Sequence, residues 1–350
     1  MVYVLFLLAL LLVGNYKYYA VGVYPGYLGK EQSQIIKGIF IALVFCGHFG
    51  QYVKFNAPLD YPFLKFYWYI GQFVVAMFLL YSGYGIMVSI MKKGRDYVRG
   101  LPVKRILKTL LHFDLAVLLY MGISVWRHGW PSLKDTLLAL SGWGGFGNSN
   151  WYIFAILWIW VIVYFVFRLC GTAHTRRNVW LCALLTALFG FIISHYKQMW
   201  WYDTLLCFPL GMLVAVYRDE IESFLFQINQ IPILGKCEKY EGVFLLLVLA
   251  VVVLGKHKGN FYLYETWMIA LTVAVFLLTM KFEFHSRILL WLGRNLFEVY
   301  ILMRIPMIIF QPYMRGHNYW YFLLCSVCTY LLVIIFSKIV KRVDRSFFAG

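Results

Sequence analysis

The sequence predicts an all-α membrane protein, a polytopic transmembrane bundle of about 11 helices. Of its 350 residues, 62% are hydrophobic and only 13% are charged, and the mean hydropathy is +0.73. No water-soluble domain of this length can bury so much apolar surface. Polar interruptions divide the chain into apolar runs of roughly 17 to 25 residues, the length that crosses a hydrocarbon core of about 30 Å. The expected spans are centred at Leu8, Leu43, Val75, Val117, Leu157, Leu185, Leu210, Leu249, Val273, Ile301 and Val333.

The net charge of +17 is distributed in a way that argues against nucleic acid as a partner. Lys and Arg concentrate in alternate loops, for example between Lys92 and Lys108 and between Lys338 and Arg345. Loops rich in Lys and Arg face the cytoplasm in membrane proteins. We therefore expect a multi-pass protein of the plasma membrane, surrounded by lipids. Its N-terminus is expected outside, its C-terminus in the cytoplasm, and Lys37 at the cytoplasmic end of the second span.

The two ends of the chain differ from its central part. The apolar run within residues 1–20 has no basic segment before it and no clear A-x-A cleavage site after it, so it predicts an additional transmembrane helix rather than a secretory signal. Residues 341–350 are expected to form a short basic tail in the cytoplasm. The seven cysteines have no metal-ligand spacing and form no evident pair in an external loop. We therefore expect neither a metal site nor a disulfide framework.

The segment KGIFIALVFCGH places a lysine and a histidine on one helix face within an apolar run. Steps of about 100° bring His48 to within roughly 20° of Lys37, and a rise of about 1.5 Å per residue separates them by roughly 16 Å. If Lys37 marks the membrane surface, His48 lies near the middle of the bilayer, where ionisable side chains are functional by default. The alternative is a histidine that bonds to a neighbouring carbonyl and takes no part in chemistry.

The third span, around FLLYSGYG, contains small residues and hydroxyl groups. One interpretation is that the hydroxyls of Ser82 and Tyr84 line a cavity around His48. The other is that Ser82 and Gly83 let two helices approach closely. The sequence leaves both interpretations open.

The most basic stretch of the chain, MKKGRDYVRGLPVKRILKTL, follows this span. Arg105 and Lys108 stand three residues apart on a starting helix, close to Arg99 and Lys104, on the side where Lys37 is expected. A guanidinium group binds phosphate as a bidentate fork, and lysines bind it as point charges. The cluster therefore predicts an anion site at the cytoplasmic end of the histidine helix, although ordinary anchoring by positive charge explains part of it.

Two further segments supply candidates for the wall of the cavity. The outer loop SGWGGFGNSNWY ends with Asn150, Trp151 and Tyr152, and its aromatic rings form either an interfacial belt or a platform on which a sugar stacks. In the second case the asparagines supply hydrogen bonds. The tenth span carries Glu298 and Arg304 about two turns apart. These two residues form either part of the cavity or a buried ion pair between helices.

Together these motifs resemble membrane acyltransferase family 3, whose members modify carbohydrates and lipids of the cell envelope. The resemblance covers roughly residues 32–340 and depends on the order and spacing of the motifs. They are a basic residue, ten residues and a histidine at Lys37 to His48, FLLYSGYG at 78–85, KRILK at 104–108, NWY at 150–152, FPLGM at 208–212 and LGRNLFEVYIL at 292–302.

The resemblance implies a core of about ten helices, to which the helix in residues 1–20 is additional. It implies an O-acetyltransferase-like enzyme without a bound cofactor, which takes acetyl-CoA or another acyl-CoA from the cytoplasm. The acceptor is a hydroxyl of a surface polysaccharide or lipid-linked glycan. The resemblance also implies that His48 is the essential histidine and that Lys37 and the basic stretch serve the donor. Lys37 replaces a more usual arginine, and Met303 and Arg304 stand where relatives often have a histidine.

We expect His48 to act as a general base that removes the proton of the acceptor hydroxyl as it attacks the thioester, which requires a neutral imidazole. An acyl-histidine intermediate stays open, as does a separate protein that receives the acyl group. Oxyanion stabilisation is expected from Ser82, Tyr84 or Asn150. The alternative function is a transporter or flippase of a lipid-linked sugar without acyl transfer, although the sequence shows none of the internal repeats that many transporters have.

Overall fold

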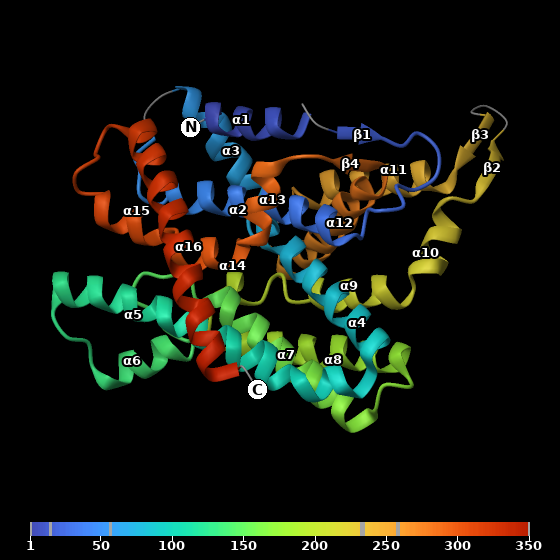
Figure 1. The fold of residues 1–350 in the computed structure, drawn as a ribbon. Helices are drawn as coiled ribbons and strands as arrows, with labels where there is room; N and C mark the ends of the chain where they lie inside the picture. The colour runs from blue at the N-terminus through green and yellow to red at the C-terminus, as the bar shows by residue number, and fades with distance from the viewer. Residues whose placement is uncertain (1, 14–15, 56–57, 232–234, 257–259, 349–350) are drawn as a thin grey trace.

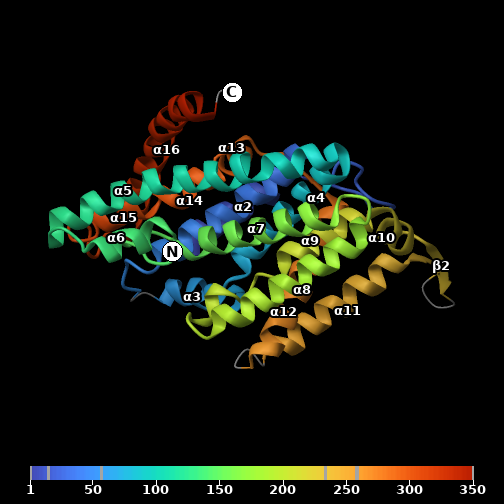
Figure 2. The same cartoon turned by 90° about the horizontal axis from the view of Figure 1, so that it is seen from below.

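The computed structural model is almost entirely helical (Figure 1). It describes residues 2–13, 16–55, 58–231, 235–256 and 260–348. Most of the long helices run side by side, and helix α16 (Asn318–Phe348) crosses them and projects from the bundle at its C-terminal end (Figure 1, Figure 2). The prediction of a nearly all-α chain is confirmed.

Two short antiparallel strand pairs accompany the helices. Strand β1 (Tyr16–Tyr18) pairs with β4 (Phe282–Phe284), and β2 (Ile228–Ile231) pairs with β3 (Gly235–Glu238). A π-helix (Pro102–Leu107) lies between α4 and α5. The other helices, in chain order, are α1 (Val2–Val13), α2 (Lys30–Phe49), α3 (Tyr61–Ile70), α4 (Phe73–Leu101), α5 (Lys108–His128), α6 (Leu133–Leu140), α7 (Trp151–Cys170), α8 (Thr175–Ser194), α9 (Cys207–Val216), α10 (Arg218–Leu225), α11 (Lys239–Leu254), α12 (Phe261–Lys281), α13 (Arg287–Arg294), α14 (Leu296–Leu302) and α15 (Arg304–Phe310).

Within the described residues, six helical segments are long and apolar enough to cross a membrane. They are α2, the stretch 73–128 that contains α4 and α5, α7, α8, α12 and α16. Every expected span centre lies in a helix. A count of about 11 full spans is not confirmed, because α1 has 12 residues, α9 has 10 and α11 has 16, too few for about 30 Å of hydrocarbon. The six segments still indicate a multi-pass membrane protein.

The expected tenth span is divided into α13, α14 and α15. The breaks fall at Asn295 and Met303. Pro306 explains the second break, because it has no N–H to bond the carbonyl of Leu302 and its ring crowds that carbonyl. Arg304 follows directly after this break, at the start of α15.

The expected seventh span contains only the 10 helical residues of α9. Before α9, the chain follows an irregular path over residues 199–206, with a 3-10 turn at Met199–Trp201. Irregular backbone is tolerated at membrane depth where protein covers it. Asp203, Thr204 and Leu205 are all buried, which meets that condition.

The basic stretch after the third span is helical rather than a loop. Gly94 interrupts α4 with a φ of +58°, in the left-handed region that glycine adopts at little steric cost. Pro102 then opens the π-helix that leads into α5. The basic side chains therefore project from a bent helix in different directions, because each lies at its own angle around the axis.

Glycines let two pairs of helices pack with their backbones in contact. A Cβ atom at Gly83 of α4 would lie 2.0 Å from the carbonyl oxygen of Phe208 in α9, and one at Gly211 of α9 would come within 1.9 Å of the backbone of α4. Gly38 of α2 and Gly293 of α13 make the same kind of approach, at 1.9 and 1.7 Å. Close helix packing, one of the two interpretations of Gly83, is therefore its role in this fold.

Contacts between distant segments join residues that the charge distribution assigns to one side of the membrane. On the expected cytoplasmic side, Lys108 forms an ion pair with Asp344 at 2.6 Å, and β1 pairs with β4. On the expected outer side, the amide of Asn318 donates to the carbonyl of Lys54 at 3.0 Å. The fold thus accommodates the alternation of loops that the positive charges indicate.

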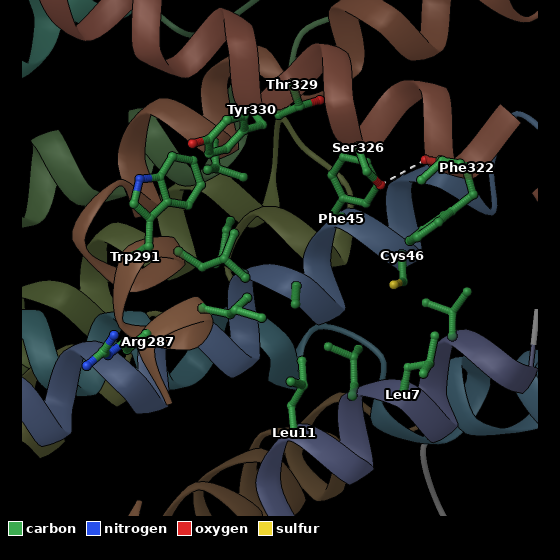
Figure 3. Close-up of a pocket in the computed structure, with 18 of the residues that line it drawn as sticks. Leu7, Leu11, Phe45, Cys46, Arg287, Trp291, Phe322, Ser326, Thr329 and Tyr330 are labelled. Atoms are coloured by element: carbon green, nitrogen blue, oxygen red, sulfur yellow. Dashed lines mark hydrogen bonds between the residues drawn. The ribbon is translucent and has the colours of Figure 1, made fainter. Parts of the chain in front are cut away.

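The N-terminal helix α1 covers one side of an apolar cavity of about 690 Å³. Figure 3 shows Leu7 and Leu11 of α1 across this cavity from Phe45 of α2, Trp291 of α13 and Tyr330 of α16. Helix α1 is thus attached to the bundle through apolar side chains. At the other end of the chain, α16 continues through the described part of the expected basic tail, residues 341–348.

We predict that replacement of Gly83 with Ala destabilises the protein, whereas the same replacement at Gly85 does not. The new methyl group at Gly83 would overlap the carbonyl of Phe208, and overpacking of this kind costs about 1–3 kcal/mol or more. Nothing lies within 4 Å of a Cβ at Gly85, so there the better helix propensity of Ala is the main change. Thermal unfolding in detergent tests the pair, and equal midpoints for the two variants would contradict the close packing of α4 and α9.

Candidate active site

His48 lies in the last turn of α2 and faces the interior of the bundle. Its Nε2 lies 3.2 Å from the hydroxyl oxygen of Ser149. Its Nδ1 is buried and has no hydrogen-bond partner in the described part of the chain. Ser149 thus engages Nε2, and Nδ1 is the ring nitrogen that a reacting group can use.

Helix α2 begins at Lys30, so Lys37 does not stand at its start. His48 follows Lys30 by roughly 27 Å of helix, and it follows Lys37 by roughly 16 Å. The helix thus extends seven residues before Lys37, and the place of Lys37 at the membrane surface stays a prediction. His48 lies near the end of the helix that the charge distribution assigns to the outer side.

A cavity of about 450 Å³ surrounds His48, and we call it the histidine cavity. It is lined by Val44, Gly47, His48, Gln51, Tyr67, Gly71, Gln72, Val74, Val75, Trp151, Trp200, Tyr300 and Arg304. Trp200 comes from the irregular segment before α9, and Arg304 comes from the first residue after the break in the tenth span. Both interruptions of regular helix therefore supply side chains to the surroundings of His48.

Arg304 is fixed at the edge of the histidine cavity. Its guanidinium donates to the hydroxyl of Tyr52 at 2.9 Å and to the side-chain oxygen of Gln51 at 3.1 Å. The placement predicted for Arg304 thus agrees with the geometry. Glu298 does not line this cavity; it lies in α14 within electrostatic reach of His112 and Lys341. The alternative of a Glu298–Arg304 ion pair does not occur in the described structure.

The loop at 141–150 holds Ser149 against His48. The side-chain amide of Asn150 donates to the carbonyls of Gly142 and Gly144, at 2.9 and 2.6 Å. The loop folds back on itself through these bonds, and the following residue, Trp151, enters the wall of the histidine cavity. Asn150 itself does not line the cavity. Its role is to shape the loop, which is a correction to its predicted place in the wall.

Lys197, outside the spans, attaches the same loop to the irregular segment before α9. Its ammonium group donates to the carbonyl of Trp143 at 2.8 Å and lies 4.0 and 4.3 Å from the ring centres of Trp143 and Trp201. Burial against these groups lowers the pKa of Lys197 from its ordinary value. The contact joins the two chain segments that carry Ser149 and Trp200.

A second cavity, of about 340 Å³, contains Lys37, Ser82 and Arg105. We call it the lysine cavity. Its lining has two cations and several hydroxyl-bearing side chains, Ser82 and Thr109 among them, and no carboxylate. Such a site suits an anionic group, for which Arg105 offers a fork and Lys37 a point charge. The structure thus brings together three residues that lie far apart in the sequence.

An aromatic layer separates the two cavities. Tyr152 lines the lysine cavity and Tyr300 lines the histidine cavity, and their rings are 5.4 Å apart. The ring of Tyr152 also meets Phe78 at 6.1 Å, and that of Tyr300 lies 6.4 Å from the imidazole of His48. One ring from each cavity wall thus stands between the two cavities.

Tyr84 lies outside both cavities, contrary to the expectation that it faces His48. Its hydroxyl lies near Arg218 of α10. Ser82 and Tyr84 are two residues apart on a helix and therefore point to different faces. Only Ser82 of this pair faces the lysine cavity.

The four basic residues expected at one anion site are divided among separate places. Arg105 lines the lysine cavity. Arg99 lines a different cavity, Lys104 is exposed, and Lys108 pairs with Asp344. The structure therefore does not support a single phosphate site made from all four side chains.

Three residues at the site, Ser149, Tyr300 and Trp200, were not predicted from the sequence. Ser149 stands between Asn148 and Asn150, the asparagines expected to supply hydrogen bonds. Only the fold shows that its hydroxyl reaches His48, 101 positions away in the chain. A signal was present for Tyr300, which precedes Arg304 by one helical turn. Trp200 gave no local signal, because its place depends on the irregular segment.

The family model of an acyltransferase domain, that of acyltransferase family 3, matches residues 31–338. The chain belongs to this family. The match covers both cavities and confirms the resemblance found in the motifs, so the protein is a multi-pass membrane acyltransferase. Neither the comparison with curated proteins nor that with solved structures gave a match. Among the described residues of this acyltransferase, no group of three His, Cys, Asp or Glu side chains could hold a metal ion.

We predict that replacement of Asn150 with Ala loosens the loop and lowers acyl transfer. The variant loses two hydrogen bonds, each worth about 0.5–1.5 kcal/mol, and leaves two carbonyls without their donor. Limited proteolysis within residues 141–150 and turnover measure the effect. The control is Asn318→Ala, which also removes a hydrogen bond from a side-chain amide to a backbone carbonyl, that of Lys54, but in a different segment of the chain. Proteolysis and turnover equal to those of the control would show that Asn150 does not hold the loop.

Proposed function

We propose that this acyltransferase moves an acyl group, in our proposal acetyl, from acyl-CoA on the cytoplasmic side to a hydroxyl of a surface polysaccharide or lipid-linked glycan on the outer side. The observation that carries the proposal is the arrangement of two cavities along α2. One contains Lys37 and Arg105, and the other contains His48. An anion site and a histidine roughly 16 Å apart suit a donor with phosphates at one end of a long arm and a thioester at the other.

In the proposed complex, the lysine cavity binds the diphosphate of the donor. Lys37 and Arg105 face it as cations, and the hydroxyl of Ser82 adds a hydrogen-bond donor. The pantetheine arm then passes the aromatic layer of Tyr152 and Tyr300 toward His48. Because no carboxylate lines the lysine cavity, an anionic ligand also offsets the repulsion between the two cations.

At the thioester, Nδ1 of His48, which Ser149 leaves free, takes the proton of the acceptor hydroxyl while the hydroxyl oxygen attacks the thioester carbonyl. The tetrahedral intermediate collapses, the carbon–sulfur bond breaks, and the thiolate of CoA takes the proton from the imidazolium. The guanidinium of Arg304 lies at the edge of the same cavity, where it stabilises the oxyanion better than the expected Tyr84 or Asn150, which are engaged elsewhere. An acyl-histidine relay, or transfer to a separate acceptor protein, would use the same nitrogen.

The outer part of the histidine cavity suits a sugar. Trp151 and Trp200 present aromatic rings there, and Gln51 supplies an amide. Aromatic rings pack against the apolar faces of sugars, and side-chain amides bind hydroxyl groups. These features support a glycan acceptor, and the positive-inside pattern supports the plasma membrane with the N-terminus outside and the C-terminus in the cytoplasm.

The first prediction from this mechanism concerns His48→Ala. Loss of a general base lowers turnover by about 10² to 10⁴, so release of CoA from acetyl-CoA should fall to background in the presence of a glycan extract. The measurement uses purified protein in detergent, and unfolding temperature verifies that the variant is folded. His195→Ala is the control, because His195 is exposed at an outer turn.

Equal turnover in wild type and His48→Ala would remove His48 from the chemical step. If the wild type releases no CoA with any extract, a transporter or flippase of a lipid-linked sugar becomes the better interpretation. Such a protein would move its substrate without consuming acyl-CoA.

The second prediction concerns Ser149, which we regard as a positioning residue for the imidazole. Ser149→Ala removes a hydrogen bond to Nε2, and at about 1 kcal/mol for such a bond we expect kcat to fall roughly 5-fold. Ser149→Thr keeps the hydroxyl and should restore most of kcat. A loss as complete as that of His48→Ala would contradict a positioning role and would instead indicate that Ser149 receives the acyl group.

A further inference from the structure

A third cavity, of about 290 Å³, is lined by Arg95, Arg99 and Arg168, and we call it the arginine cavity. The arginines come from α4 and α7, and their side chains are exposed. Val98 and Phe167, both buried, lie beneath them. Three guanidinium groups thus face one hollow from two helices that are separate in the sequence.

The charges of the arginine cavity are not balanced by the protein around it. No carboxylate is among its lining residues, and the ion pair of Arg99 with Asp96 is long, at 4.0 Å, and exposed to water. The carbonyl end of α7, at Cys170, contributes the equivalent of roughly half a negative charge. That is far less than the three positive charges of the arginines. An anion in the cavity would reduce their mutual repulsion and accept several charge-assisted hydrogen bonds.

The arginine cavity lies on the same seam between α4 and α7 as the lysine cavity. Along α4, Arg95 follows Ile86 of the lysine cavity by nine residues and stands directly after the bend at Gly94. Along α7, Arg168 follows Trp160 of the lysine cavity by eight residues, or roughly 12 Å. The three cavities therefore follow one another in a fixed order, with the arginine cavity at the end farthest from His48.

From this order we infer that the arginine cavity binds the 3′-phosphate of the acyl-CoA donor, an inference that rests on the proposed function. Acyl-CoA carries its phosphates in the same sequence, with a 3′-phosphate on the ribose, then a diphosphate, then the pantetheine arm and the thioester. A phosphate monoester is a dianion with three acceptor oxygens, which suits several guanidinium forks. The same phosphate chemistry could come from the headgroup of an anionic lipid, so the experiment has to separate the two sources.

The test compares acetyl-CoA with 3′-dephospho-acetyl-CoA as donors for wild type and Arg168→Gln. Wild type should use acetyl-CoA with a kcat/KM roughly 10-fold or more above that of the dephospho form, because only the former has the phosphate. In Arg168→Gln this ratio should fall toward one, because kcat/KM falls with acetyl-CoA and stays the same with the dephospho form. Arg95→Gln should do the same. Arg177→Gln, a nearby exposed arginine that does not line the cavity, has the same change in charge and should keep the ratio.

An unchanged ratio in Arg168→Gln and Arg95→Gln would overturn the inference. If these variants keep the ratio and also retain less phosphatidylglycerol through purification than wild type does, the inference is likewise overturned. The anion in the arginine cavity would then be a lipid headgroup.

Failure of the proposed function is a different outcome, because wild type would then turn over neither thioester. The unfolding temperature in the presence of adenosine 3′,5′-bisphosphate, compared with adenosine 5′-monophosphate, still decides the inference in that case. A larger rise with the bisphosphate in wild type that is lost in Arg168→Gln supports a 3′-phosphate site. Equal shifts with both nucleotides overturn it.

Discussion

Backbone groups inside a membrane need hydrogen bonds, so a chain can leave the helix there only where protein covers the break or a polar cavity receives it. This constraint organises the site. The break before Arg304 and the irregular segment at 199–206 both lie against the histidine cavity, and each supplies a side chain to its wall. The glycine contacts of α2 with α13 and of α4 with α9 allow these helices to pack closely around the site. Regular helices thus form the frame of the site, and their interruptions supply side chains to the wall around His48.

The parts of the site that follow from helical geometry were predictable from the sequence. The spacing of Lys37 and His48 puts both on one face, and both line interior cavities. The same geometry, applied to Ser82 and Tyr84, would have shown that they point to different faces. What stayed out of reach depends on contacts across the chain. Ser149 meets His48 only after a loop folds back, and no local pattern encodes this contact.

The fold was predictable to the same extent. Apolar runs located a helix at each of the expected span centres, since each run marks a segment whose backbone has to bond internally, but they did not locate α3, α6 or α10. Their number did not give the number of full spans, because Pro306 divides one run and buried polar residues such as Asp203 replace part of another with irregular structure. Likewise Lys108 looked available for a phosphate, but Asp344, from the far end of the chain, pairs with it. Hydropathy reports local sequence, and these departures arise from tertiary contacts.

The aromatic layer formed by Tyr152 and Tyr300 has a consequence for the membrane as an electrical insulator. A passage wide enough for a thioester arm would also conduct protons and small ions if it stayed open to water at both ends. With the two rings 5.4 Å apart, bulky side chains stand between the two hollows. A donor arm that lies between the two rings would itself fill the passage and exclude water and ions from it. Catalysis and the preservation of the ion gradient would then depend on the same pair of rings.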